Sequence, residues 1–266
     1  MAGRAPRTPD GPPPPPVVCK LRARYAKRGR LRFTSSRDIA RVFERAVRRA
    51  GVPIAHSAGF SPHPKLSWVG AAPTGVASEA EYVEIGLTAY VDPDATAAAL
   101  DRVLPPGLDV CEAVLAGPGS LADRMEASVW ELRLPGADRA EVEKALAAFR
   151  AADVVPVARR TKSGIRDVDT RGPSLVWVIR EADEPGCVIL RGVVRHTTPV
   201  VRPDDVLAGM RAVAPLELGS PLVATRLAQG PLRADHSTGL DVEEFGVGDP
   251  LAPDRANGGG DPRLSA

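Results

Sequence analysis

The 266-residue sequence has few cysteines and few aromatic residues. Its three cysteines, Cys19, Cys111 and Cys187, are odd in number and widely spaced, which argues against a disulfide framework and indicates a reducing, cytoplasmic environment. No close pair of cysteines, or of a cysteine and a histidine, provides the spacing of a zinc or iron–sulfur site, so we expect no metal in this chain. Aromatic residues make up only 4%, and Leu, Val and Ala must therefore fill the core.

Long apolar runs and the common catalytic motifs are also lacking. No segment approaches the length of a membrane span, and the N-terminal region has no apolar core of the kind found in secretory signals. The sequence contains no GxxxxGK[ST] loop, no GxGxxG after a strand, no HExxH and no serine elbow. These absences argue against P-loop, dinucleotide-binding, zinc-protease and serine-hydrolase chemistry.

Both ends of the sequence are predicted to be disordered. Residues 1–16 finish in five consecutive prolines, which favour an extended and unpacked chain. Residues 233–266 are polar, rich in Gly, Pro and Asp, and without periodicity; seven acidic and three basic residues give them a net charge of −4. This acidic tail either keeps the protein soluble or screens a basic surface elsewhere in the chain.

Between these ends, hydrophobic periodicity predicts the order strand, helix, strand, strand, helix, strand, twice over. The first half has expected strands at 18–25, 66–69, 81–91 and 108–115 and expected helices at 35–51 and 92–104. The second half has expected strands at 129–134, 175–180, 187–194 and 221–228, one further strand at 154–158, and expected helices at 138–150 and 203–213. We therefore predict an α+β protein of two tandem ferredoxin-like (βαββαβ) units, at 17–116 and 127–230.

Positive charge is concentrated near the start of the first unit. Between Cys19 and Lys65, thirteen basic residues oppose only Asp38 and Glu44, a local net charge of +11 in a chain of net charge +2. Alternation gives the first strand a basic face, and arginines at i, i+4, i+8 and i+11 form a stripe on the first helix. The predicted phosphate contacts in this region are Arg22, Arg24, Lys27, Arg28, Arg30, Arg37, Arg41 and Arg45. We expect them to share one solvent-facing patch that binds a polyanion; the alternative is a solvated face that reflects an arginine-rich composition.

The loop from Gly59 to Ser67 is a second candidate site. Pro62 and Pro64 stiffen it and fix where His63 and Lys65 point, and His63 and Lys65 are predicted to lie at the edge of the nucleic-acid surface. Alternatively, His56, His63 and Lys65 are candidates for acid–base and electrostatic roles in cleavage or transfer of a phosphodiester. A third interpretation is a rigid connection whose histidine only bonds to backbone.

The segment from Arg159 to Arg171 is the third candidate. Arg159, Arg160 and Lys162 precede a Ser-Gly turn and are predicted to add to the nucleic-acid surface. The alternative is a solvated hairpin loop that Asp167 and Asp169 neutralise locally.

Four stretches of the sequence carry a family resemblance. They are 24–33 with Ser35 and Asp38; Gly51 with 59–64; Pro73, Gly75, Ser78 and Glu81; and 161–164 with Asp169 and Arg171. Together they resemble the radical SAM-linked, or radical SAM-associated, bacterial proteins, a domain of unknown function, over roughly residues 17–230. The family pattern continues from the Asp of the last stretch into Ile-Arg-Pro, whereas this sequence reads Asp-Thr-Arg-Gly-Pro over residues 169–173.

The resemblance implies a radical SAM enzyme as a partner on a separate chain. That partner would carry an iron–sulfur cluster and S-adenosylmethionine, and this chain would hold no cofactor. Paired ferredoxin-like units are also similar to RNA-handling proteins such as CRISPR repeat-processing endoribonucleases, an analogy of fold that does not set function.

We therefore expect a cytoplasmic accessory protein of a radical SAM system that binds structured RNA without its own chemistry and without a membrane. Two alternatives remain open. One is an RNA-cleaving or RNA-modifying enzyme that uses the histidines. The other is an adaptor whose basic face docks on an acidic surface of the radical SAM enzyme.

Overall fold

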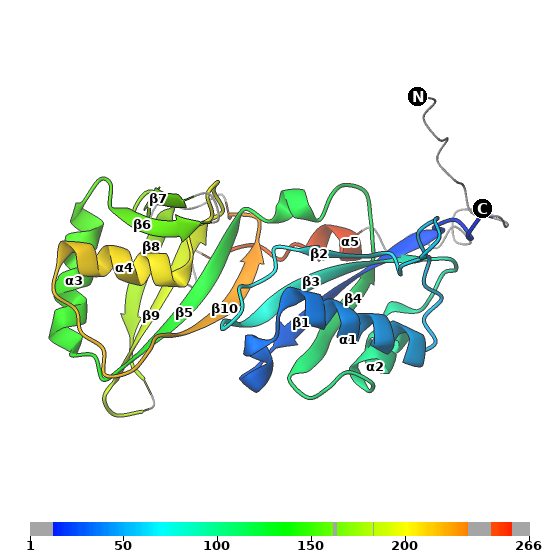
Figure 1. Ribbon diagram of the computed structural model, residues 1–266, viewed down its shortest axis with the longest axis horizontal. Coiled ribbons are helices and arrows are strands. Elements are labelled where there is room, and N and C mark those ends of the chain that lie inside the picture. Colours follow the sequence, from blue (N-terminus) through cyan, green and yellow to red (C-terminus); the bar gives the residue numbers. More distant parts are fainter. Residues whose placement is uncertain (1–12, 162–163, 183, 234–245, 257–266) are drawn as a thin grey trace, which may run out of the picture. The chain divides into compact units, whose positions relative to one another are not determined.

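The computed structural model describes residues 13–161, 164–182, 184–233 and 246–256, which form a mixed α+β protein (Figure 1). The predicted α+β class is therefore confirmed. The chain divides into two compact units. Unit 1 contains the described residues up to Ala71, then Glu81–Gly119, then the described residues from Leu251 onward; unit 2 contains Ala72–Ala80 and Ser120–Pro250.

Unit 1 is a sheet with the helices α1 and α2 packed on one face (Figure 1). Its strands lie in the order β4-β1-β3-β2 and span Cys19–Lys27 (β1), Leu66–Val69 (β2), Ala77–Leu87 (β3) and Leu108–Leu115 (β4). Its helices are η1 (Gly29–Phe33, a 3-10 helix), α1 (Ser36–Arg49), α2 (Pro93–Asp101) and α5 (Ala252–Ala256). Leu21, Ala23 and Tyr25 of β1 share a core with α1 and α2, and the Tyr25 and Phe43 rings lie 4.8 Å apart. The face of β1 that carries these residues is the one covered by α1 and α2.

Both long helices of unit 1 begin where the sequence predicts. The Ser35 hydroxyl accepts a hydrogen bond from the Asp38 N–H (3.2 Å), and the Asp92 carboxylate accepts one from the Ala95 N–H (2.9 Å). Pro93 occupies the first turn of α2. These caps satisfy N–H groups that have no partner within the helix, and so they fix the residue at which each helix starts.

Unit 2 has the same order of elements with an added hairpin. Its main strands are β5 (Ala127–Pro135), β8 (Ser174–Arg180), β9 (Cys187–Arg195) and β10 (Val223–Gly230), in the order β10-β5-β9-β8 with each neighbouring pair antiparallel. The helices are η2 (Ala122–Arg124), α3 (Arg139–Ala151) and α4 (Pro203–Val213). The first residues of β3, Ala77 and Ser78, pair in parallel with Thr225 and Arg226 of β10. Side chains of α3 and α4 fill the core with those of the main strands.

Two segments depart from the sequence-based expectations. The strand expected at 154–158 does not join the main sheet: it forms β6 (Pro156–Thr161), which pairs with β7 (Gly164–Asp169), from the segment expected to be a loop, in a separate two-stranded sheet. The predicted disorder of 233–266 is wrong for 246–256, where Val247 forms a β-bridge with Leu232 and α5 carries the buried Asp254. Composition favours disorder there, but the side chains that bury this segment come from far earlier in the sequence. Residues 13–16 form no helix or strand, and the rest of both predicted tails lies outside the described residues.

Candidate functional site

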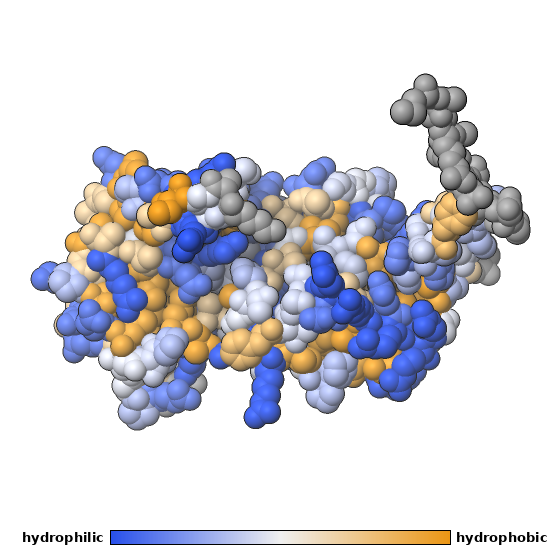
Figure 2. Space-filling view, viewed as in Figure 1, coloured by the Kyte–Doolittle hydropathy of each residue, from blue (hydrophilic) through white to orange (hydrophobic). Residues whose placement is uncertain are grey.

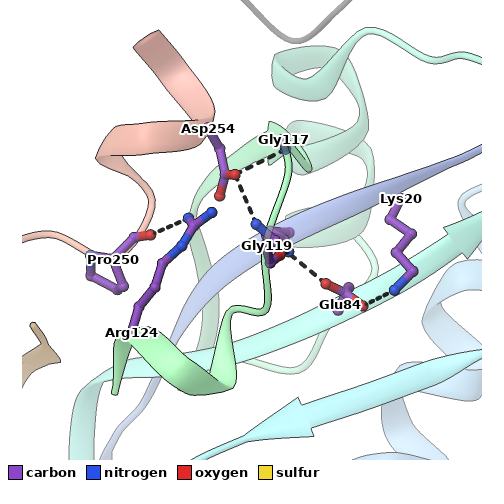
Figure 3. Close-up of polar contacts among 8 residues, drawn as sticks. Lys20, Glu84, Gly117, Gly119, Arg124, Pro250 and Asp254 are labelled. Carbon is purple, nitrogen blue, oxygen red and sulfur yellow. Dashed lines mark hydrogen bonds and ion pairs between the residues drawn. The ribbon is translucent and has the colours of Figure 1, made fainter. Parts of the chain in front are cut away.

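The basic face of β1 lies opposite the helices, and its central residue is buried. Arg22 is 3% exposed and donates from Nε to Glu84 Oε2 (3.0 Å), from Nη1 to Asp254 Oδ1 (2.7 Å) and from Nη2 to the Gly119 carbonyl (2.6 Å). Asp254 is fully buried and also accepts the Gly117 N–H at 2.9 Å (Figure 3). A buried guanidinium with all three nitrogens engaged is not available to phosphate. The prediction that Arg22 contacts nucleic acid is therefore wrong.

Glu84 is the carboxylate shared between two basic residues of β1. Lys20 Nζ lies 2.6 Å from Glu84 Oε1, as Figure 3 shows, and Arg22 holds the other oxygen. Burial alone would raise the pKa of Glu84, but the hydrogen bonds and positive charges of Lys20 and Arg22 outweigh burial and lower this pKa. The carboxylate therefore stays ionised and neutralises part of the charge that the sequence assigned to the surface.

Further predicted phosphate contacts are also buried or paired. Lys27 is only 1% exposed. Arg24 Nε lies 3.9 Å from Glu112 Oε2, and Arg28 Nη1 lies 2.8 Å from Asp109 Oδ2. Because the charges of β1 and those of α1 lie on opposite sides of the unit 1 sheet, the single patch expected from the sequence does not form.

The exposed positive charge of unit 1 is concentrated on α1. We call Arg37, Arg41, Arg45, Arg48 and Arg49 the arginine face. All five are exposed, because the opposite side of α1 packs against the sheet. Among described residues their one ion pair joins Arg41 Nη1 to Asp38 Oδ1 at 3.5 Å, and both side chains are more than half exposed. Figure 2 shows hydrophilic side chains gathered over this helix. Arg30 of η1 is exposed as well and forms no ion pair with a described residue.

A pocket of about 310 Å³ lies at the C-terminal end of α1. Glu44, Arg48, His56 and Pro64 are among its lining residues. The chain leaves α1 through Gly51, whose φ of 68° suits glycine, and then pairs His56 with Pro64 in an isolated β-bridge. These turns bring His56 to the same wall as Arg48, so the pocket adjoins the arginine face.

The other two residues of the proposed catalytic trio do not line this pocket. His63 and Lys65 are exposed residues. The backbone N–H of His63 donates a hydrogen bond to the Ser57 hydroxyl at 3.0 Å. The structure therefore assigns one of the three candidates, His56, to a concave site. His63 and Lys65 are available for contact with a ligand along the loop.

Of the three basic residues predicted in the third candidate segment, the structure describes two, and one of these is exposed. Arg159 donates from Nη1 to Asp205 Oδ2 (2.8 Å) and to the Val200 carbonyl (2.7 Å), which anchors β6 to α4. Arg160 is exposed and forms no ion pair with a described residue. Lys162 lies outside the described residues.

Sequence reasoning missed the partners of β1. The signal for Glu84 was present, because it alternates with Val83 and Ile85 on a strand of the same sheet and so faces away from the helices, as Arg22 does. Asp254 offered no such signal, because it follows a proline in a tail of low hydrophobicity.

Two features of wider function classes are absent from the described residues. No helix in that part of the chain combines the length and apolar character needed to cross a membrane. No group of three or more His, Cys, Asp and Glu side chains in the same residues is arranged to hold a metal ion.

Comparisons with known proteins identify a family and no activity. No curated protein gives a significant match to the sequence. A solved structure titled "Structure A of CRISPR endoribonuclease Cse3 bound to 19 nt RNA" is 13% identical, with 76% of this chain and 100% of that chain covered, but its TM-score of 0.18 carries no argument. Residues 20–203 match the family described as "Uncharacterized protein conserved in bacteria (DUF2344)". Because this match covers more than half of the chain, the protein belongs to that bacterial family.

Proposed function

We propose that unit 1 binds RNA through the arginine face of α1. The observation that carries this proposal is the presence of five exposed arginines on one helix that has only two acidic residues, Asp38 and Glu44. Arginine offers a planar fork of donors that matches phosphate oxygens. Except for Arg41, which lies beside Asp38, the arginines of this face have no carboxylate partner among the described residues from which a phosphate would have to separate them.

The length of the arginine face suits a nucleic-acid backbone. At about 1.5 Å per residue, the distance along the helix from Arg37 to Arg48 is roughly 16 Å. A face of this length can contact several phosphates of one nucleic-acid strand together. This arrangement supports binding to a continuous backbone.

The pocket beside Arg48 favours RNA with an unpaired segment. Its wall combines His56 with the apolar side chains of Val52 and Ile54. Proteins that read RNA commonly stack unpaired bases on aromatic or histidine rings and on arginine guanidinium planes. A nucleotide in the pocket would place its phosphate near Arg48.

We further propose that the protein is an accessory component of a radical SAM system. The support is the resemblance of four sequence stretches to the radical SAM-linked proteins. The partner would be a separate enzyme that supplies the iron–sulfur cluster and S-adenosylmethionine, and the three free cysteines of this chain are compatible with a reducing cytoplasm. The strand orders β4-β1-β3-β2 and β10-β5-β9-β8 support the interpretation of both units as ferredoxin-like.

Salt-dependent RNA binding tests the central proposal. Fluorescence anisotropy with a labelled stem-loop RNA is measured over a series of salt concentrations for the natural protein and for Arg41→Gln/Arg45→Gln/Arg48→Gln. The control, Arg139→Gln/Lys144→Gln/Arg166→Gln, removes the same charge from exposed positions of unit 2. If three phosphate contacts are lost, the slope of log K against log[salt] falls by about 2 to 3 in the first variant, because each contact contributes roughly 0.7 to 0.9.

Equal loss in both triple variants, or binding that does not depend on salt, would refute the arginine face as the RNA site. Incubation with RNA then separates the alternatives: cleavage that His56→Ala abolishes would establish an enzyme. Co-purification of a radical SAM enzyme that survives nuclease treatment and depends on the arginine face would establish an adaptor.

A further inference from the structure

A pocket in unit 2 holds two arginines close together. Its volume is about 230 Å³, and its lining includes Arg150 at the end of α3, Arg171 before β8, and Ser174 and Trp177 of β8. The lining contains no acidic residue. Neither Arg150 nor Arg171 forms an ion pair with a described residue. The pocket thus contains two uncompensated positive charges.

The ladder pattern leaves the backbone N–H of Trp177 on β8 without a sheet partner among the described residues. Directly beyond the two ends of β9, His196 donates its N–H to the Glu126 carbonyl and the Gly186 carbonyl accepts from the Gly136 N–H. Continued along the antiparallel ladder, these bonds connect the even-numbered residues of β9 to β5 and the odd-numbered ones to β8. Trp177 lies opposite Gly192, an even-numbered residue. Its N–H and C=O therefore point to the outer edge of the sheet, since β8 has β9 as its one neighbour in that sheet.

Both guanidinium groups are held in place by backbone carbonyls. Arg150 Nη2 donates to the Trp177 carbonyl, and Arg171 Nη1 donates to the Ser174 carbonyl at 3.0 Å. Arg171 also donates from Nε and Nη2 to the Arg150 carbonyl, at 3.4 and 3.3 Å. Each guanidinium has five N–H donors, so both retain donors after these bonds. The nearby Asp169 directs its oxygens to the N–H groups of Val155, Arg171 and Gly172.

The closeness of the two arginines has an electrostatic cost in the absence of an anion. Burial lowers the pKa of Arg150, and the positive charge of Arg171 lowers this pKa further. A bound anion reverses that effect by giving each cation a partner. The carbonyl contacts hold the two forks in position before a ligand arrives, which reduces the entropy lost on binding.

We propose that this pocket binds the phosphate group of a small ligand. A phosphate presents three oxygens in different directions, which two guanidinium groups and the Trp177 N–H can contact together. A carboxylate offers only two oxygens in one plane. The volume corresponds to about seven or eight water molecules, at roughly 30 Å³ each, so a phosphate with part of an organic body fits. The apolar side chains of Phe149 and Leu175 supply a surface for that body.

Titration of the full chain with inorganic phosphate and, separately, with adenosine 5′-monophosphate tests this site. ¹H–¹⁵N NMR follows the Trp177 amide and the arginine Nε groups at constant ionic strength, with chloride as the competing anion. We expect saturable shifts at Trp177, Arg150 and Arg171 with a dissociation constant in the millimolar range or below. Tighter binding of the nucleotide than of phosphate would identify an organic phosphate as the ligand, and equal binding would identify free phosphate.

Matched variants distinguish a phosphate-binding site from arginines whose role is only to donate to the backbone carbonyls of β8. Arg150→Lys and Arg171→Lys keep the charge but remove the planar fork, and each is expected to weaken phosphate binding by tenfold or more. Lys144→Gln, an exposed position on the same helix, should bind as the natural protein does. Absence of saturable shifts in the natural protein, which needs no variant to fold, would overturn the proposal. So would equal affinity in the lysine variants. The arginine face of unit 1 plays no part in this test, so either proposal can fail without the other.

Discussion

Replacement of Arg22 by methionine should destabilise the protein far more than loss of an ordinary surface arginine. The substitution Arg22→Met removes three hydrogen bonds and leaves the fully buried Asp254 carboxylate with the Gly117 N–H among its partners. Breaking a buried ion pair by removing one partner costs about 3 to 5 kcal/mol, because the remaining charge stays desolvated. Glu84 retains Lys20, so the main penalty arises at Asp254.

Urea denaturation of matched variants measures this effect. The control Arg28→Met breaks the pair with Asp109, whose side chains are 49% and 40% exposed, and should cost about 0 to 1 kcal/mol. Asp254→Asn leaves Arg22 paired with Glu84 and should cost about 1 to 3 kcal/mol. The double variant Arg22→Met/Asp254→Leu should be more stable than the sum of the single effects predicts, because it leaves no unpaired charge. Similar losses for Arg22→Met and Arg28→Met would refute the reasoning.

Three further predictions concern protonation and packing. The lowered pKa of Glu84 contributes stability at neutral pH, so the free energy of unfolding should fall as pH drops below about 4.3, and Glu84→Gln should flatten that part of a urea-derived pH profile. Burial lowers the pKa of His196, and the positive charge of Arg226 lowers this pKa further, although the hydrogen bond to the Met125 carbonyl acts in the opposite direction. Stability should therefore also decline below about pH 6.5, and an NMR titration midpoint for His196 at or above that value would contradict this. Gly192→Ala places a Cβ in steric overlap with the Trp177 ring, so thermal denaturation should show a loss of about 1 to 3 kcal/mol, and an unchanged midpoint would refute the packing.

Local patterns in the sequence predict most elements of the fold. The capping residues Ser35 and Asp92 fix the starts of α1 and α2, and the spacing of apolar residues identifies the buried side of α1. Helix α4 and strands β2 and β4 have the predicted bounds, and the starts of several other elements lie within two residues of the prediction. These features depend on neighbours within one or two turns of the chain, and such neighbours are visible in a single sequence.

The candidate site was less predictable because it depends on distant neighbours. The alternating pattern of β1 correctly places Arg22 and Leu21 on opposite faces, but a polar face is not necessarily a solvent-exposed face. Whether Arg22 reaches water depends on Asp254, whose segment has a composition typical of disorder. The exposed arginine stripe on α1 was predicted correctly, because a helix that packs one apolar side against the core turns its opposite side to solvent.

The ion pair between Arg22 and Asp254 joins positions 232 apart in the chain. During synthesis on the ribosome, the strands of unit 1 emerge long before Asp254 does. The nascent unit therefore carries Arg22 with only part of its final set of partners, and it reaches full stability only after Asp254 has been made. A truncated product that stops before this helix would expose an incompletely neutralised interior, which marks it for removal by cellular proteases.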